Sequence, residues 1–284
     1  MLLNPFKFHS PQKLEEAVSL YNSLPGVRIL AGGTFLINNL KLLKKKGLKT
    51  PENIISLRRI DELKGISCHK KELSIKALTS VSELYSSLSL LEYSQIFKAV
   101  SRNLATTPIR NMATIGGNLM CRYCWTEFPA LLIALKANLH FIATDLKEEA
   151  VPVEEFFKNS AKSEKILTRV TLTLDPQNCI CYQSVRKSSS VDIPLLAVCI
   201  KTKFSKKRFS ETIVAVNNGT SFARRDSVLE NFLNQSECSI KTADESSQHL
   251  DTSLYDASRD DYKEHMFRVT IKNTLRELMT GRHP

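Results

Sequence analysis

Hydrophobic and polar positions along the chain follow two different periods, so both helices and strands are expected. Apolar residues spaced three or four apart predict a helix over 11–21, with Ser10 as its N-cap. The short apolar run 27–30 predicts a buried strand that leads directly into Ala31-Gly32-Gly33-Thr34. A second helix is predicted over 38–46. The order strand, glycine turn, helix is typical of a turn that approaches a ligand with its backbone.

The same patterns divide the rest of the chain into two parts at the polar segment 175–178. Before it they predict strands at 53–57, 139–143 and 166–174, a hairpin over 67–77, helices at 81–90, 93–103, 128–137 and 154–157, and a strand followed by a turn at 113–118. After it they predict three antiparallel strands at 182–186, 197–204 and 213–216, and helices at 225–234 and 262–279. The polar stretch 238–261 is predicted to be a loop. We therefore expect an α+β protein with domains 1–177 and 178–284.

Composition indicates a folded protein without a membrane span. The chain has 284 residues, of which 42% are apolar, and no apolar run approaches the length that a bilayer requires. No secretory leader is predicted at the N-terminus. Seven cysteines are scattered without the rhythm of a secreted disulfide scaffold. Reduced thiols in the cytoplasm are the simplest interpretation.

The net charge is +11, and most of the excess lies in the first 178 residues. Part of it is a run of lysines, namely Lys41, Lys44, Lys45, Lys46 and Lys49. Either this run is the solvated end of a helix, or it is a basic face for an acidic partner subunit. No aromatic residues are interleaved with it and no recognition signature is present, so nucleic acid is not an expected partner.

Two glycine pairs are the most informative feature of the sequence. The chain has nine glycines, and four of them form Gly32-Gly33 and Gly116-Gly117. A glycine pair permits positive φ angles and lets a ligand reach bare main chain, where successive N–H groups bind anions. Each pair is followed by a small polar residue, Thr34 or Asn118. The two turns predict the two halves of a diphosphate, although neither has a Walker or a Rossmann spacing.

The remaining candidate groups leave their roles open. Cys121 and Cys124 form a C-x-x-C directly after the second glycine pair. A metal site, a redox dithiol and simple loop packing all remain possible for them, although no second C-x-x-C completes a four-ligand site. Tyr123 and Trp125 either stack on a cofactor or fill the loop. The six histidines are isolated and no catalytic residue is predicted, as in a subunit whose cofactor performs the chemistry.

The stretches 29–36 and 109–119, with the apolar helix from Pro129 onward, resemble the FAD-binding medium subunit of molybdenum hydroxylases of the xanthine dehydrogenase and carbon monoxide dehydrogenase type. The resemblance implies a two-subdomain FAD domain of the vanillyl-alcohol-oxidase type over 1–177. It also implies a small C-terminal domain with a three-stranded antiparallel sheet and helices over 178–284. It implies no metal ligands, and it implies FAD contacts from Ile29, Leu30, Ala31, Gly32, Gly33, Thr34, Phe35, Leu36, Leu104, Thr114, Ile115, Gly116, Gly117, Asn118, Thr126 and Leu167.

Some positions depart from the family pattern. Thr126 stands where the family has an aspartate beside the ribose region, with Glu127 next to it. Ser184 stands where the family has a lysine, with Arg186 and Lys187 close behind. Phe35 stands where an acidic residue is common. The source of a cation beside the flavin is therefore open.

By this resemblance the chain is an oxidoreductase subunit that passes electrons from a [2Fe–2S] small subunit to NAD or another acceptor. A molybdopterin-binding large subunit would oxidise a purine or another N-heterocycle. Two alternatives stay open: a stand-alone flavoprotein oxidoreductase, and an assembly or binding protein that has kept the fold without its cofactor.

Overall fold

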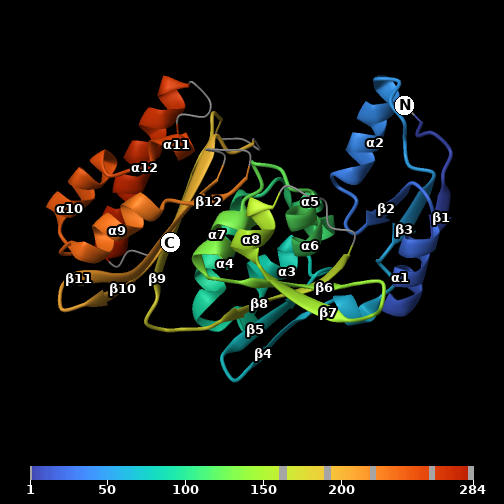
Figure 1. Cartoon of the computed structure of the whole chain (residues 1–284), viewed down its shortest axis with the longest axis horizontal. Helices are drawn as coiled ribbons and strands as arrows, with labels where there is room; N and C mark the ends of the chain where they lie inside the picture. The colour runs from blue at the N-terminus through green and yellow to red at the C-terminus, as the bar shows by residue number, and fades with distance from the viewer. Residues whose placement is uncertain (1, 160–164, 189–192, 218–221, 256–259, 281–284) are drawn as a thin grey trace.

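A computed structural model describes residues 2–159, 165–188, 193–217, 222–255 and 260–280. Its N-terminal part is a parallel three-stranded sheet of order β1-β3-β2, made of β1 (Lys7–His9), β2 (Val27–Leu30) and β3 (Asn53–Ser56). Helices α1 (Leu14–Ser23) and α2 (Leu36–Lys45) connect these strands. Figure 1 shows this blue part at one end of the molecule. The predicted strand-turn-helix order at the first glycine pair is confirmed.

The middle part is an antiparallel five-stranded sheet of order β4-β5-β8-β6-β7. Its strands are β4 (Ile66–His69), β5 (Glu72–Lys76), β6 (Asn138–Ile142), β7 (Glu148–Pro152) and β8 (Ile166–Thr173). The predicted hairpin turns at Lys70 and Lys71, both with positive φ. The helical elements of this part are η1 (Asp61–Leu63), α3 (Val81–Ser86), η2 (Leu88–Tyr93), α4 (Ser94–Asn103), α5 (Thr107–Met112), α6 (Ile115–Met120), α7 (Phe128–Ala134) and α8 (Val153–Lys158).

The C-terminal part is an antiparallel sheet of order β12-β11-β10-β9. Its strands are β9 (Cys179–Val185), β10 (Leu196–Ser205), β11 (Arg208–Asn217) and the short β12 (Arg224–Arg225). It carries α9 (Ser227–Gln235), α10 (Ile240–Glu245), η3 (Ser246–Gln248), α11 (Thr252–Tyr255) and α12 (Asp261–Thr280). The three predicted strands are confirmed, and the two-residue β12 adds a fourth strand to the expected sheet.

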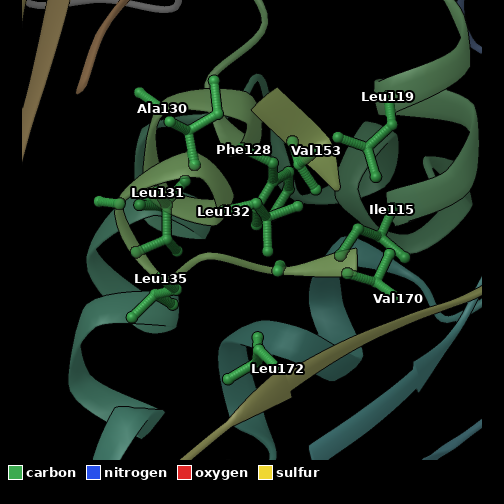
Figure 2. Close-up of a cluster of buried hydrophobic side chains, with 14 of the residues drawn as sticks. Ile115, Leu119, Phe128, Ala130, Leu131, Leu132, Leu135, Val153, Val170 and Leu172 are labelled. Carbon is green, nitrogen blue, oxygen red and sulfur yellow. The ribbon is translucent and has the colours of Figure 1, made fainter. Parts of the chain in front are cut away.

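One hydrophobic core extends across the predicted domain boundary. All seven residues of α7 are buried, and this helix packs against β10 and β11 of the C-terminal sheet. Figure 2 shows Phe128, Leu131 and Leu132 of α7 among side chains from α6, α8 and β8. An all-apolar helix of this kind is stable only where it is covered on every side. The C-terminal part supplies one of those covers.

Two local predictions about helix starts and turns are wrong. The segment 113–118 is not a strand and turn, because Thr114 caps the helix α6 by accepting a hydrogen bond from the Gly117 amide. Helix α1 begins at Leu14 and not near Ser10, and the Leu14 amide is satisfied by the distant carboxylate of Glu62 at 3.0 Å.

The polar stretch 238–261 was expected to be a loop, yet much of it is helical. It contains α10, η3 and α11, whereas residues 256–259 lie outside the described part. Among the helices that the structure describes, none has the length and apolarity to cross a membrane.

Candidate functional site

A cavity of about 720 Å³ lies where the N-terminal sheet, the middle part and the C-terminal part meet. Its walls include the end of β2, the turn 31–35 and the start of α2. Opposite these lie the start of α6, the segment 120–127 and residues of β8. Arg186, Ile193 and Pro194 close it from the C-terminal part. A volume of this size is in the range of small-molecule and cofactor sites.

The first glycine pair presents unused backbone donors to this cavity. Gly33 has φ +78°, a left-handed conformation that turns the chain from β2 into α2. Within the described residues, the backbone N–H groups of Gly32, Gly33, Thr34 and Phe35 donate to no protein acceptor. The N-terminus of α2 follows at Leu36, and its dipole adds positive potential at the same place. This turn is therefore suited to an anionic group such as a phosphate.

The second glycine pair contributes in a different way from the one expected. The Ile115 amide donates to Thr79 O at 3.0 Å and the Gly116 amide to Ala77 O at 2.9 Å. The Gly117 amide donates to Thr114 Oγ1 at 3.1 Å. These three amides are thus already satisfied by the protein. What remains available is the proton of the Thr114 hydroxyl and the side chain of Asn118, both of which line the cavity.

The two turns lie directly against each other. A Cβ atom on Gly32 would stand 2.0 Å from the carbonyl oxygen of Met112, and one on Gly117 would stand 3.7 Å from the Ala31 Cβ. A Cβ atom on Gly116 would meet the Ala77 carbonyl oxygen at 2.7 Å. Close backbone packing therefore explains Gly32 and Gly116 independently of any ligand. The same packing brings the two predicted motifs to one cavity.

The structure brings together fourteen of the sixteen residues that the sequence resemblance marks as FAD contacts. Leu30 and Ile115 do not line the cavity. The Leu30 side chain packs against Gly33, and Ile115 is fully buried in the core. The fourteen lining residues are Ile29, Ala31, Gly32, Gly33, Thr34, Phe35, Leu36, Leu104, Thr114, Gly116, Gly117, Asn118, Thr126 and Leu167.

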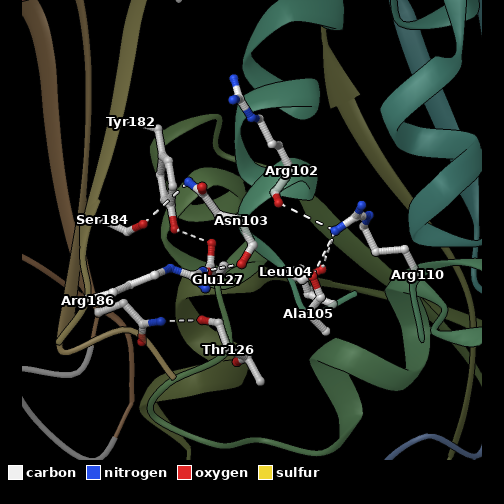
Figure 3. Close-up of polar contacts among 11 residues, drawn as sticks. Arg102, Asn103, Leu104, Ala105, Arg110, Thr126, Glu127, Tyr182, Ser184 and Arg186 are labelled. Carbon is white, nitrogen blue, oxygen red and sulfur yellow. Dashed lines mark hydrogen bonds and ion pairs between the residues drawn. The ribbon is translucent and has the colours of Figure 1, made fainter. Parts of the chain in front are cut away.

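A buried acidic group forms part of the cavity wall beside Thr126. The Glu127 side chain is 4% exposed, and its Oε2 accepts a hydrogen bond from the Tyr182 hydroxyl at 2.8 Å. Its Oε1 accepts from the Arg186 guanidinium, which also donates to the Asn103 carbonyl oxygen. Burial raises the pKa of Glu127 to about 7, although Arg186 and Tyr182 pull it down. Figure 3 shows Tyr182, on β9, and Arg186, the residue after the strand's last position, both directed at Glu127.

The structure shows where Thr126 and Ser184, which depart from the family pattern, lie relative to the cavity. The Thr126 hydroxyl donates to Tyr123 O at 2.9 Å, and its carbonyl accepts from Asn217, so the residue can only accept from a ligand through its hydroxyl oxygen. Ser184 does not line the cavity and instead accepts a hydrogen bond from Asn103 at 3.4 Å. Arg186, two residues further along the chain and just past the end of β9, reaches the wall in its place.

Three aromatic rings close one side of the cavity. The Phe35 ring lies 4.6 Å from Tyr123 and 6.1 Å from Trp125, and the Tyr123 and Trp125 rings stack at 5.2 Å. Tyr123 and Trp125 therefore pair with each other and with the first glycine turn. This cluster gives Phe35 a packing role at a position where an acidic residue is common in the family.

The C-x-x-C segment carries no metal site in the part of the chain that the structure describes. The Cys121 thiol donates to the Asn118 carbonyl at 3.0 Å, and burial raises its pKa to about 11. Such a thiol is a poor nucleophile at neutral pH. Arg122, between the two cysteines, stacks on Phe156 and Phe222 at 4.7 and 4.9 Å and fixes the loop. Loop packing is therefore the best supported of the three interpretations.

Two observations show that the residues present fit a dinucleotide such as FAD. The amides of the first turn need an acceptor, and a diphosphate supplies several. The buried Asn118 Oδ1 has no hydrogen-bond partner in the described protein, so it needs a donor such as a sugar or ribityl hydroxyl. The lining is otherwise mostly apolar, as the rings of a flavin and an adenine require.

A cavity with this donor set and apolar lining fits a dinucleotide-binding protein. Residues 4–174 match the family of the FAD binding domain in molybdopterin dehydrogenase, and the chain belongs to this family. The FAD cofactor and the oxidoreductase class predicted from the sequence are thereby confirmed.

Individual relatives share the fold over the whole chain and the sequence over part of it. The chain is 32% identical to the carbon monoxide dehydrogenase medium chain of Hydrogenophaga pseudoflava over 154 residues, which are 54% of this chain and about half, 52%, of that relative. It is 23% identical to the nicotine 6-hydroxylase medium subunit of Paenarthrobacter nicotinovorans over 87% of each chain.

Solved structures of the same kind superimpose over the full length. Carbon monoxide dehydrogenase from Hydrogenophaga pseudoflava gives a TM-score of 0.88 at 22% identity, with 100% of both chains covered. Quinoline 2-oxidoreductase from Pseudomonas putida 86 gives 0.88 at 19% identity, also with 100% of both chains covered. At this identity the likeness establishes the α+β fold and nothing further.

Several lining residues escaped the sequence analysis as site residues. Glu127, Arg186 and Asn103 meet only after folding, since 59 positions separate Glu127 from Arg186 in the chain. The Arg110 guanidinium donates to the carbonyls of Leu104 and Ala105 at the cavity wall. In the sequence, Arg110 stood out only as a member of the stretch 109–119. The one available signal was the pair of departures at Thr126 and Ser184, which lie next to these residues in space.

Proposed function

We propose that this chain is the FAD-carrying electron-transfer subunit of a molybdenum hydroxylase. The observation that carries the proposal is the convergence of unsatisfied donors at the first glycine turn and the unsatisfied Asn118 oxygen on one cavity. Bound FAD would supply the two-electron chemistry. The chain's own groups bind, orient and shield it.

Each group has a defined task in this proposal. The amides of Gly32 to Phe35 bind the diphosphate, and the Thr114 hydroxyl donates to the same group. The Asn118 oxygen accepts from a hydroxyl of the cofactor. Leu104 and Leu167 pack beside the ring system, while Phe35 and its aromatic neighbours exclude water.

The names of the matched family and of the relatives support the proposed partner subunits. The matched family is that of molybdopterin dehydrogenases, and relatives are named medium chain or medium subunit. This supports a molybdopterin-binding large subunit and a [2Fe–2S] small subunit as partners, with NAD or another acceptor taking the electrons. Nicotine and quinoline in the relatives' names support an N-heterocycle as the substrate. All seven cysteines are free, which supports a cytoplasmic location.

The first experiment is the absorption spectrum of the purified protein. We expect flavin bands and one FAD released per chain on heating. A colourless protein that does not take up added FAD would contradict the proposal and favour an assembly protein. A yellow monomer that NADH reduces fully, without partners, would favour a stand-alone oxidoreductase instead.

The lysine run supplies a test of partner docking. Lys45 and Lys46 are exposed at the end of α2, and the Lys44 ammonium donates to the Leu2 carbonyl at 2.9 Å. If this basic face binds the iron–sulfur subunit, changing residues 44–46 to glutamate weakens co-purification of the complex at low salt. The matched control reverses the exposed pair Lys206 and Lys207 in the C-terminal hairpin. Intact assembly of the first variant would discard the docking role.

A further inference from the structure

The carboxyl group of Glu127 is an unusual component of a cofactor cavity. It sits at the N-cap of α7, it is almost fully buried, and it lines the cavity. Each of its two oxygens has one partner, the Tyr182 hydroxyl or the Arg186 guanidinium. The FAD contacts proposed above do not use this group.

The balance of forces on Glu127 leaves its charge easy to change. Burial disfavours the ionised form and holds the pKa of the carboxyl near 7, while Arg186 and Tyr182 favour the carboxylate. Because burial outweighs these two groups and the pKa lies near neutral pH, a modest change in local potential moves the carboxyl from one protonation state to the other. A negative charge in the same cavity would favour the protonated form, since charges interact strongly where water is excluded.

The charged surroundings of Glu127 are few within the described residues. Tyr182 on β9 and Arg186, directly after β9, are the charged and titratable groups that face it. From α4 and β11 the neighbouring side chains are the uncharged Asn103 and Asn217.

Two further elements, α8 and β12, pack against α7 and carry charges that are paired with each other. Arg225 binds Glu154 at 3.1 Å and Glu230 at 2.5 Å. On the cavity wall itself, Arg28, Arg122 and Lys165 are the other charged residues. All three are basic, so Glu127 is the only acidic group among the described lining residues.

We propose that Glu127 is the proton-accepting group of the FAD cavity, binding one proton when two electrons enter the bound cofactor and releasing it when they leave. The inference rests on the proposed function, in which iron–sulfur clusters of a partner subunit supply the electrons. One O–H bond forms on the carboxylate during reduction, with the proton drawn from solvent, and the same bond breaks on reoxidation. Only the cofactor changes its oxidation state.

Arg186 acts as the positioning residue of this site. It bonds to the Asn103 carbonyl as well as to Glu127, so it stays in place when the carboxyl becomes neutral. Protonation of Glu127 removes a negative charge from the cavity wall, while the Arg186 guanidinium keeps its positive charge. The loss of that negative charge favours the negatively charged reduced cofactor, which couples the two events.

The decisive measurement is the midpoint potential of bound FAD as a function of pH between 6 and 8.5. One proton per two electrons corresponds to a tenfold change in equilibrium constant per pH unit, or about 30 mV. Above pH 7, where the carboxyl is ionised in the oxidised protein, we expect the slope for Glu127→Gln to be smaller than that of the wild type by this amount. Glu127→Asp should keep most of the wild-type slope. The matched control Glu237→Gln, at an exposed glutamate, should equal the wild type.

A second readout does not depend on the cofactor. Infrared pH titration of the protein without FAD should show a buried carboxyl band that disappears near pH 7 in the wild type and is absent from Glu127→Gln. Equal potential slopes in wild type and Glu127→Gln, or a titration complete below pH 5, would overturn the proposal and leave the proposed function intact. A wild-type protein that binds no FAD would overturn both, and the absorption spectrum shows this before any potential is measured.

Discussion

At the scale of single residues, the four paired glycines have different physical reasons to be glycine. Gly32 and Gly116 lie where a side chain would collide with a neighbouring backbone carbonyl. Gly33 provides the left-handed conformation of the turn, and Gly117 lies 3.0 Å, measured from an added Cβ, from the Thr114 hydroxyl that caps α6. The pairs therefore shape the cavity chiefly by letting the protein pack on itself.

Replacing Gly32 with alanine should be severely disruptive. The new Cβ would stand 2.0 Å from the Met112 carbonyl oxygen, and neither backbone can move without separating the two turns. We expect a loss of about 3 kcal/mol in the free energy of unfolding and at least a tenfold loss of FAD affinity. Urea denaturation and fluorescence titration with FAD measure both.

Gly47→Ala is the matched control for that variant. Gly47 has φ +65° but nothing within 4 Å of an added Cβ, and it does not line the cavity. It should cost about 1 kcal/mol and leave FAD affinity unchanged. Equal effects of the two variants would show that contact between the turns does not govern the site.

The thiol of Cys121 should resist alkylation. Its pKa of about 11 leaves little thiolate at pH 8, whereas Cys68 is exposed on β4. Mass spectrometry after brief iodoacetamide treatment should find Cys68 modified and Cys121 intact, with Cys121 reacting increasingly as the pH approaches 11. Rapid formation of a disulfide between Cys121 and Cys124 with oxidised glutathione would restore the redox interpretation.

The glycine pairs were predictable because glycine is rare in this chain and both pairs follow apolar segments. The division of labour between them was not, because it depends on which amides other parts of the protein already use. The carbonyls of Thr79 and Ala77, which accept the amides of the second turn, lie 36 and 39 positions earlier in the chain. Hydrophobic periodicity is detected in windows of about 11–18 residues, so it carries no information about such distant contacts. The Glu127–Arg186 pair was hidden for the same reason.

At the scale of elements, the junction between α4 and α5 shows how a helix end forms part of the cavity. The chain leaves α4 at Asn103 and turns through Ala105, which has φ +47°. The Arg110 guanidinium on α5 donates to the carbonyls of Leu104 at 3.1 Å and Ala105 at 2.8 Å. Figure 3 shows that it also reaches the Arg102 carbonyl at the end of α4. Arg110 thereby satisfies carbonyls that the helix end leaves free.

Removing this guanidinium should loosen one wall of the cavity. In Arg110→Ala the carbonyls of Leu104 and Ala105 lose their donor, so Leu104 is no longer fixed against the cofactor. We expect about a tenfold weaker FAD affinity and a loss of about 1–3 kcal/mol in stability. Arg102→Ala is the control, because that exposed side chain has no hydrogen bond among the described residues. Wild-type visible circular dichroism of the flavin in Arg110→Ala would contradict this role.

The elements that the sequence pattern identifies best are the strongly apolar ones, such as α7 and β8. The misassigned helices α6 and α10 have six residues each. Helix α10 was placed in a loop because its composition is polar, yet Ser239 caps it by accepting from the Thr242 amide at 3.2 Å. In the same way Thr114 caps α6. Capping residues close to glycine or serine are as typical of turns as of helix starts, so local sequence does not separate these two cases.

At the scale of the whole molecule, the cavity has walls from the N-terminal, middle and C-terminal parts. The matched family covers residues 4–174, but Arg186, Ile193 and Pro194 also line the cavity. The C-terminal part further covers α7 and binds Glu127 through Tyr182. The predicted domains 1–177 and 178–284 therefore share a site and a core, and the position of the boundary stays a prediction.

A chain that ends at residue 177 should fail to hold FAD. It lacks part of the cavity wall, and it exposes the apolar face of α7 that β10 and β11 cover. We expect this fragment to aggregate or to bind a dye for exposed apolar surface, and to purify without flavin absorbance. Cooperative unfolding of the fragment together with FAD binding of wild-type affinity would show that the first domain is independent.

The position of Arg186, Ile193 and Pro194 at the cavity wall has a consequence for biosynthesis. The ribosome releases the glycine turns first and these three residues later, and domains begin to fold from the N-terminal side. The nascent chain thus passes through a stage in which the groove is open and the cofactor has free access. Flavin supply during translation, rather than after it, should then decide how much of the protein is made in its loaded form.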